Sequence, residues 1–411
     1  MITVGLDFGT HQTKVCIEDR QGAETHYKFQ RFRDLSGHLL YTLPSVIYID
    51  DNHRLHYGFA PKDKKCTIIR YFKQAVFRNN DSQNMKLWEA AFYSIWYLAY
   101  ILFELEEKYG HYFTIQMGAP TDSSRLNDAK AIAVSIIVSA YKLVEKVFKN
   151  DKDKFLNCDY DSLVELTEVI RYSDQLKKDY ALLVFPEAYA CLKPMVGRGK
   201  ISTGMNLIID IGGGTTDISF FTIENRQPQV YDFFSVDKGL NFLMGIDVKS
   251  PSAPPSGWII QQRAKVLHAD ILRLCVSLEE RLKAEFESQT DLEIRRLRDA
   301  LKKRPIIYTG GGSTFKELLY PYNEFKELHT ISYDNWKSKL FDDDELFKNT
   351  SLCPVLSTAY GLAISVATDE ISKKPLRDIF ELCRGAEEES KKKFGEALSG
   401  FDYGTDWDAW K

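Results

Sequence analysis

The sequence contains no long hydrophobic run. Its most apolar window, residues 92–103, falls well short of the ~20 apolar residues that a helix needs to cross a bilayer. The first residues read as a strand, and they carry no basic segment of the kind that opens a secretory signal peptide. We therefore expect no membrane-spanning helix and a cytoplasmic location.

Paired cysteines are also missing. None of the seven cysteines has the Cys-x-x-Cys spacing of zinc and redox motifs, and most lie in apolar contexts. We expect free, buried thiols in a reducing compartment and no structural zinc. Charge is nearly balanced, at −4 with scattered basic residues, and this gives no reason to expect a nucleic-acid partner.

A P-loop of the Walker A type is absent as well. Gly199-Lys200 comes nearest to the pattern, but Ile201 follows the lysine and Pro194 stands where the first glycine is required. What the sequence does have is length and apolar content. Its 411 residues exceed the ~250–300 at which a single core usually splits, so we expect at least two domains.

Two segments of the chain share one plan: an apolar strand, an aspartate at its end, a glycine turn and an outgoing strand. Asp7 and Asp210 are these aspartates, 203 positions apart (210 − 7). Glycine turns let backbone N–H groups approach an anion closely, and the carboxylates could hold an accompanying hydrated metal ion. The candidate anion-binding residues are Gly9, Thr10, Thr13 and Lys14, then Gly212, Gly213, Gly214, Thr215 and Asp217.

A third glycine turn, Gly310–Ser313, follows the apolar run at residues 306–308. One glycine-rich hairpin alone would be an ordinary turn. Three such turns behind three strands, two of them with matching aspartates, indicate two related halves that face each other across a nucleotide. The remaining patterns predict helices at 88–109, 125–149, 263–289, 291–303 and 357–365, and strands at 113–117, 181–185 and 230–236.

These motifs resemble those of the actin-like ATPase superfamily, which includes actin, sugar kinases and the seventy-kilodalton heat-shock chaperones. Asp7–Thr10 resembles the first phosphate motif, Asp210–Asp217 the second and Gly310–Thr314 the adenosine motif. Glu187–Cys191 and Ala359–Ala363 are similar to the two connecting helices. The five motifs occur in the expected order along the chain.

The chaperone ATPase domain is the most similar branch, and Pro120–Arg125, which opens a helix after a strand, resembles it too. Two features depart from that branch. The proline of the chaperone glutamate-proline pair precedes Glu187 here, as Pro186. Only 39 residues follow Ser372 (411 − 372), too few for the peptide-binding domain of the chaperones.

The resemblance implies an α/β fold of two lobes, which are duplicated ribonuclease H-like domains with a nucleotide cleft between them. Lobe I would comprise residues 1–190, with an outer subdomain at 35–107 and a returning segment at 354–380. Lobe II would comprise residues 191–353, with an outer subdomain at 234–304. A charged and aromatic tail, residues 381–411, would follow.

The resemblance also implies the chemistry of the cleft, which would bind ATP or ADP with Mg²⁺. Asp7 and Asp210 would hold Mg²⁺ through water molecules. Lys73 would contact the γ-phosphate, and Glu187 would lie near the attacking water, a role that Asp210 shares. The ribose and adenine would lie along Gly311, Gly312 and Ser313. Slow hydrolysis would then control lobe closure and the interaction with a partner.

Three other functions stay open at this point. One is a filament-forming actin-like ATPase of the plasmid-segregating kind, which would self-assemble with ATP rather than act as a monomer. A small-molecule kinase is less favoured, because no further aspartate is available as a general base for a substrate hydroxyl. An inactive scaffold would not need Asp7, Lys73, Glu187 and Asp210. An unidentified protein partner could dock on the tail, which carries Trp407 and Trp410.

Overall fold

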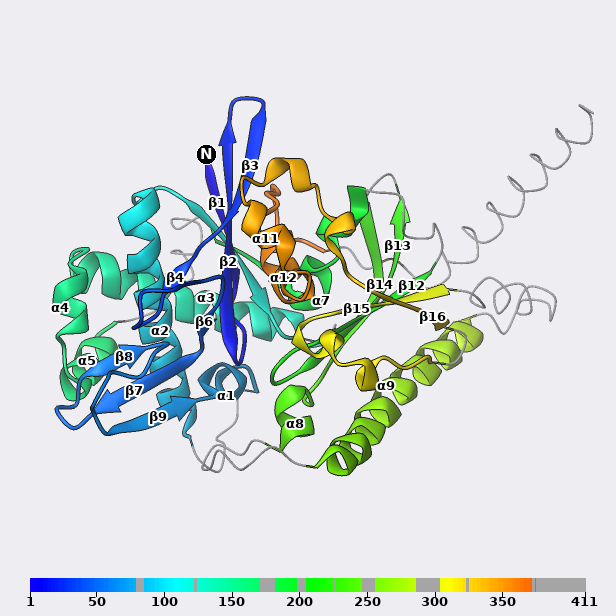
Figure 1. Ribbon diagram of the computed structural model, residues 1–411, viewed down its shortest axis with the longest axis horizontal. Coiled ribbons are helices and arrows are strands. Elements are labelled where there is room, and N and C mark those ends of the chain that lie inside the picture. The colour runs from blue at the N-terminus through cyan, green and yellow to red at the C-terminus, as the bar shows by residue number, and fades with distance from the viewer. Residues whose placement is uncertain are drawn as a thin grey trace, which may run out of the picture.

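The computed structural model describes residues 1–78, 85–121, 124–170, 182–197, 205–224, 227–245, 256–285, 304–322, 325–371 and 374. The expected helix at 291–303 and the expected tail at 381–411 lie outside these ranges. The described part is a mixed α/β structure with two large sheets and helices packed around them (Figure 1).

The first large sheet has the strand order β11-β10-β1-β2-β3, with β6 added beside β2. Strands β1, β2 and β3 are antiparallel neighbours, whereas β10 and β11 run parallel to β1. The strands are β1 Ile2–Asp7, β2 Gln12–Gln21, β3 Glu24–Phe29, β6 Leu43–Pro44, β10 Thr114–Ala119 and β11 Leu182–Pro186. The strands expected at 113–117 and 181–185 are therefore confirmed as β10 and β11.

The second large sheet repeats this topology. Its order is β14-β13-β12-β15-β16, in which β12, β13 and β14 are antiparallel neighbours and β15 and β16 run parallel to β12. The strands are β12 Asn206–Ile211, β13 Thr216–Glu224, β14 Gln227–Val236, β15 Arg304–Thr309 and β16 Phe325–Thr330. Because β1 and β12 hold the same place in the two sheets, Asp7 and Asp210 occupy matching positions.

Two small sheets complete the strands. A three-stranded sheet with the order β8-β7-β9 packs beside the first large sheet, and β4 pairs with β5. The bounds are β4 Phe32–Arg33, β5 Leu39–Leu40, β7 Val46–Asp50, β8 Leu55–Tyr57 and β9 Cys66–Arg70.

The helices cover the sheets and fill the space between them (Figure 1). The α-helices are α1 Phe72–Arg78, α2 Leu87–Tyr109, α3 Leu126–Lys142, α4 Lys152–Leu156, α5 Tyr160–Glu168, α7 Glu187–Ala190, α8 Leu240–Met244, α9 Gly257–Glu285, α11 Asp344–Lys348 and α12 Leu352–Ala363. The short turns are η1 Leu143–Val147, η2 Lys193–Gly197, η3 Gly311–Thr314, η4 Lys316–Leu318, η5 Tyr333–Asn335 and η6 Ser338–Leu340.

Most predicted helices are present, with shifted ends. The helix predicted at 88–109 is α2, which stops at Gly110, a residue with φ of 73° whose N–H bonds to the carbonyl of Glu106. Helix α3 ends at Lys142 and continues as a π-turn, so the prediction that it reaches 149 was too long. Helix α12 begins at Leu352 rather than 357, because Pro354 is accommodated in its first turn.

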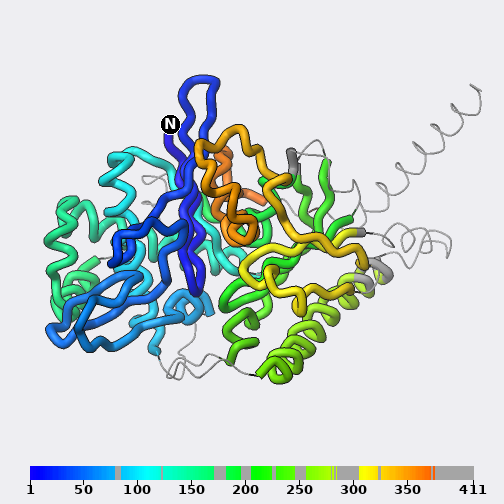
Figure 2. The backbone as a smooth tube through the Cα atoms, in the orientation of Figure 1, coloured from blue at the N-terminus to red at the C-terminus, as the bar shows by residue number. Residues whose placement is uncertain are grey.

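Helix α12 lies between the two large sheets and packs against β1, β2, α7 and β15. Figure 2 shows its orange tube next to the blue N-terminal strands. A Cβ added to Gly5 on β1 would lie 2.2 Å from the backbone nitrogen of Ala363, so only glycine permits this approach. A shared cluster that includes Phe29, Ile208 and Tyr360 joins apolar side chains of both sheets around α12.

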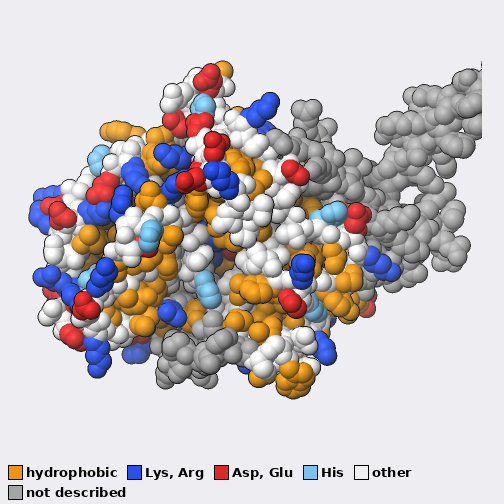
Figure 3. All heavy atoms as spheres, in the orientation of Figure 1, with side chains coloured by type: hydrophobic (Ala, Val, Ile, Leu, Met, Phe, Trp, Pro, Cys, Tyr) orange, Lys and Arg blue, Asp and Glu red, His pale blue; other side chains and the backbone are white. Residues whose placement is uncertain are grey.

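The surface seen in Figure 3 carries acidic and basic side chains interspersed over the whole face. Within the described ranges, no helix combines the length and the apolar character that crossing a bilayer requires. Six cysteines in these ranges are free thiols, four of them buried, as the spacing predicted; Cys383 lies outside them.

Lys193 is a buried lysine, only 9% exposed, with its ammonium group 4.0 Å from the centre of the Phe185 ring. Burial lowers its pKa to about 7, although the charge of Glu18 acts in the opposite direction. Between pH 7 and pH 10.5, Lys193 is protonated in the unfolded chain but largely neutral in the folded chain. The free energy of unfolding therefore rises with pH over this range.

We expect Lys193→Met to raise the free energy of unfolding at pH 7 by about 2 kcal/mol, since one pKa unit corresponds to about 1.4 kcal/mol and the aromatic contact is lost. The gain should shrink as the pH rises from 7 to 9, which denaturant titrations at several pH values would measure. Lys28→Met, at an exposed position, is the control and should show no such trend. Equal pH slopes for Lys193→Met and wild type would contradict the assignment.

Candidate functional site

A cleft with about 840 Å³ of empty volume, open solvent included, lies where β1 and β12 end. Both large sheets contribute to its wall. The predicted residues that line it are Asp7, Gly9, Thr10, Lys14, Lys73, Glu187, Asp210, Gly212, Gly213, Thr215, Asp217 and Gly311. The fold thus brings together residues that the sequence separates by up to 304 positions (311 − 7).

The first glycine turn connects β1 to β2. A Cβ on Gly9 would lie 2.2 Å from the carbonyl oxygen of Gln12, so the turn closes tightly only with glycine. The hydroxyl of Ser45 donates to the Gly9 carbonyl at 2.6 Å and holds the turn from outside the cleft. With its carbonyl engaged, the turn has a fixed shape before any ligand arrives.

Lys14 stands opposite Asp7 in the β1–β2 pairing, and its ammonium group donates to Asp7 Oδ2 at 2.7 Å. Burial alone would lower the pKa of Lys14. The charge of Asp7 and the hydrogen bond to it raise the pKa instead, with help from Asp210 and Glu187. Lys14 is therefore a fixed positive charge inside the cleft.

The second glycine turn connects β12 to β13, and the start of α8 donates hydrogen bonds to it. The N–H groups of Leu240 and Asn241 donate to the carbonyls of Gly212 and Gly213 at 3.0 and 2.8 Å. The N–H of Gly212 bonds to the Thr215 carbonyl at 2.9 Å. These bonds occupy the turn's carbonyls and leave the N–H groups of Gly213 and Gly214 without a backbone partner that the described residues supply.

Three carboxylates share the cleft, and burial is unfavourable to their charged forms. Burial raises the pKa of Asp210 to about 7, and the charges of Asp7 and Glu187 add to the effect. Lys14 and the hydroxyl of Thr358, which donates to Asp210 Oδ2 at 3.1 Å, oppose it. A cation that entered this cleft would stabilise the ionised carboxylates.

Asp217 supplies a fourth buried carboxyl group. Its Oδ2 accepts from the hydroxyl of Thr215 at 2.9 Å, and hydrogen bonding from Ser235 and Thr215 favours the charged form of Asp217. Burial and the charges of Glu187 and Asp210 raise the pKa of Asp217 well above its usual range.

Lys73 and Glu187 form a buried ion pair. The Lys73 ammonium on α1 donates to Glu187 Oε1, at the start of α7, over 2.6 Å. Both side chains are less than 10% exposed. Burial raises the pKa of Glu187, and Lys73 opposes the shift. The pair places one carboxylate and one ammonium group at the wall of the cleft, each buried beside an opposite charge.

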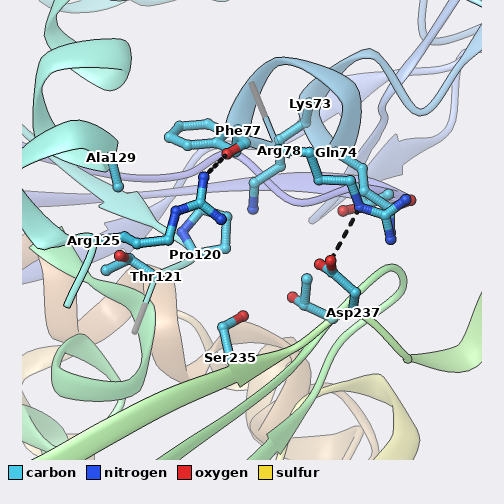
Figure 4. A pocket seen from close by; sticks show the side chains of 12 residues that line it. Lys73, Gln74, Phe77, Arg78, Pro120, Thr121, Arg125, Ala129, Ser235 and Asp237 are labelled. Atoms are coloured by element: carbon cyan, nitrogen blue, oxygen red, sulfur yellow. Dashed lines mark hydrogen bonds and ion pairs between the residues drawn. The ribbon is translucent and has the colours of Figure 1, made fainter. Parts of the chain in front are cut away.

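A second chamber, of about 590 Å³, opens behind this pair and shares Thr10, Lys73 and Thr215 with the cleft (Figure 4). Two arginines reach into it from α1 and the start of α3. Arg78 pairs with Asp237 at 3.4 Å, and Arg125 donates to the Phe77 carbonyl at 3.5 Å. Both arginines therefore have a partner in the wall of the chamber.

The third glycine turn passes directly over Asp210. Gly310 has φ of 77°, and a Cβ on it would lie 2.1 Å from Asp210 Oδ1. Gly311 lines the cleft, but Gly312 lies behind it against Ile211, and the Ser313 hydroxyl turns back to the Gly310 carbonyl at 2.8 Å. Of the three residues expected along a ribose and adenine, only Gly311 reaches the cavity.

Two more predicted residues lie beside the cleft rather than in its wall. The hydroxyl of Thr13 is fully buried at 3.1 Å from that of Ser45, on the opposite side of β2 from Lys14. Gly214 lies against Thr10, and its carbonyl accepts from Gln74 at 3.2 Å. Gln74 thereby joins α1 to the second turn.

Sequence reasoning missed some residues of the wall, among them His11 and Thr358. His11 extends from the first turn and hydrogen-bonds to Asn241 at the start of α8, and a Cβ on Gly213 would lie 2.8 Å from its ring. Its position between Thr10 and Thr13, two of the candidate anion-binding residues, is a signal that could have identified it. Thr358 gives no such signal, because it is one of several small residues in α12.

No direct metal centre is present in the part of the chain that the structure describes: no three His, Cys, Asp or Glu side chains come together to ligate an ion. The donors of the cleft suit a different arrangement. Asp7 and Asp210 are carboxylates, which are hard oxygen ligands, and Mg²⁺ usually keeps several of its waters when proteins bind it through one or two carboxylates. The residues present thus fit a hydrated Mg²⁺ brought in with a phosphate ligand.

The site and the fold together define a mixed α/β protein with two topologically equivalent sheets and an acidic, glycine-lined cleft at the ends of their first strands. Comparison with models of known protein families found no match, and comparison with curated protein sequences found none either.

Proposed function

We propose that this chain is a Mg²⁺-dependent ATPase with a two-lobed, actin-like fold, similar to the ATPase domain of the seventy-kilodalton heat-shock chaperones. One observation carries the proposal. Two glycine turns, each preceded by an aspartate at the same place in one of two equivalent sheets, face a single cleft that also contains a buried Lys73–Glu187 pair. The repeated topology supports the duplicated domains that this fold requires.

The chemistry of the cleft suits ATP or ADP with Mg²⁺. The free N–H groups of the second turn and the ammonium groups of Lys14 and Lys73 would bind phosphate oxygens. Asp7 and Asp210 would orient the waters around Mg²⁺, and the ion would neutralise charge on the phosphates. A bound cation would favour the ionised forms of Asp210 and Glu187, whose pKa values burial raises.

Glu187 would position the attacking water and accept its proton. Lys73 keeps Glu187 fixed by their 2.6 Å hydrogen bond and would contact the terminal phosphate. Phosphoryl transfer requires mostly positioning and charge neutralisation, both of which these fixed groups can supply. Because few side chains do chemistry here, slow turnover is expected.

Hydrolysis of the nucleotide would control whether the cleft is open or closed. Three polar contacts cross from the first turn and α1 to the second half: His11 with Asn241, Gln74 with the Gly214 carbonyl, and Arg78 with Asp237. All three lie close to the phosphate-binding turns. The state of the nucleotide would therefore control whether these contacts form, and through them the exposure of a surface to a cytoplasmic partner protein.

Phosphate release from ATP tests the proposal. Purified protein should release phosphate in the presence of Mg²⁺, and excess EDTA should lower the rate at least 10-fold, because the ion neutralises charge in the transition state. GTP is the parallel substrate in the same assay. Release at the level of buffer alone, or a rate that EDTA does not change, would contradict the proposed activity.

A further inference from the structure

A further cavity, with about 850 Å³ of empty volume, lies on the other side of the first glycine turn. It shares Thr10 and His11 with the cleft but is walled by the three-stranded sheet. Alternation along the strands explains its lining. Ile47, Leu55 and Tyr57 turn inward to the core, so the neighbouring positions Val46, Tyr48 and Arg70 face the cavity.

Arg70 is the charged group of this cavity. Its side chain is half-buried, and within the described ranges it makes no hydrogen bond or ion pair. No carboxylate is among the lining residues. His11 also lines the cavity, and burial lowers its pKa. The hydrogen bond to Asn241 raises the pKa of His11, whereas the positive charges of Arg70 and Lys14 lower it further. The cavity therefore has positive charge that nothing in its wall neutralises.

Tyr71, which follows Arg70, is in a strained conformation. Its φ of 65° is rare for a bulky residue, and such a conformation persists only where the surrounding structure holds it. This conformation joins β9 to α1 and sets the Tyr71 ring 5.9 Å from the ring of His11. With Tyr48 and Phe59, Tyr71 gives the cavity aromatic walls around a single guanidinium group.

We propose that this cavity binds a small organic anion, whose phosphate or carboxylate group pairs with Arg70 and whose apolar or aromatic body packs against Tyr48, Phe59 and Tyr71. Arginine pairs with either anion through two parallel hydrogen bonds, and aromatic rings supply apolar contact area around it. The site goes beyond the proposed ATPase activity and does not depend on it, because Arg70 and the aromatic residues lie outside the nucleotide cleft.

Titration calorimetry with phenyl phosphate and with benzoate tests this site in the full chain, with Mg·ADP added to occupy the cleft. We expect at least one probe to bind one site with a Kd below about 1 mM. Arg70→Gln should weaken that binding at least 10-fold, Tyr48→Ala should weaken it less, and Arg33→Gln, at an exposed arginine, should leave it unchanged. The better of the two probes identifies the anion as a phosphate ester or a carboxylate.

Binding of neither probe would overturn the proposal, as would equal affinity in Arg70→Gln and wild type. Arg70→Lys keeps the positive charge without the paired donors, and it should bind more weakly than wild type even if Arg70→Gln does not fold. Titration of Mg·ADP into the same samples separates the two proposals. Probe binding without ADP binding would leave this site in place and contradict only the nucleotide function.

Discussion

Glu187→Gln is expected to lower the rate of ATP hydrolysis by about 10²–10⁴-fold while leaving the affinity for Mg·ATP within a few-fold of wild type. The amide keeps the size of the side chain but cannot accept a proton from water, and general bases contribute about this factor. The neutral side chain also removes the negative charge beside the Lys73 ammonium, which would remain available to a phosphate. Phosphate release and calorimetric titration would measure the two effects separately.

Glu18→Gln is the matched control. Glu18 is also buried, accepts hydrogen bonds from Tyr27 and Arg20, and is not part of the cleft wall. Its replacement should leave hydrolysis within about two-fold of wild type even if it lowers stability, because it touches no group that acts on ATP. Wild-type hydrolysis by Glu187→Gln would remove Glu187 from the chemistry and leave the cleft as a binding site alone.

Gly361→Ala is expected to cause a large loss of stability although it adds only one methyl group. Gly361 lies in α12 where this helix crosses α7, and an added Cβ would lie 1.8 Å from the carbonyl oxygen of Ala190. The conflict is with backbone, which cannot rotate away as a side chain can. We expect the free energy of unfolding to fall by about 3 kcal/mol or more, measured by denaturant titration.

Gly257→Ala provides the comparison for this variant. Gly257 begins α9, and an added Cβ would meet nothing within 4 Å. Its stability should stay within about 0.5 kcal/mol of wild type. If Gly361→Ala unfolded at the same denaturant concentration as Gly257→Ala, α12 would not pack between the two sheets as the structure shows.

The sequence predicted the parts of this protein that depend on local pattern. Apolar strands followed by aspartate and glycine identified β1 and β12, and the glycine turns did line one cleft. These features could be predicted because strand alternation and the steric freedom of glycine act over a few residues. The α/β class, which the resemblance to the actin-like ATPases implied, is confirmed.

The direction of side chains was harder to predict. Thr13 belongs to the first motif but faces away from the cleft, because it alternates with Lys14 along β2. Ser313 similarly turns its hydroxyl back to its own turn. A motif gives the residue type and position, whereas the register of the strand and the local turn decide which surface the side chain reaches.

Contacts between residues that are far apart in the sequence were the hardest to predict. Lys73 and Glu187 are 114 positions apart, and only the tertiary structure places α1 so that the Lys73 ammonium lies 2.6 Å from Glu187 Oε1. The cavity around Arg70 could not be anticipated either. It arises from which face of a three-stranded sheet turns toward the first glycine turn, and this depends on tertiary packing.

The most direct test of the two-turn cleft is a calorimetric titration of Mg²⁺ and a non-hydrolysable ATP analogue into wild type, Lys14→Ala and Gly213→Val. We expect one binding site per chain in wild type and at least 10-fold weaker binding in each variant, because each alters a different turn of the cleft. Absence of binding to wild type, or binding that is insensitive to the change in one of the turns, would contradict a cleft formed by both turns.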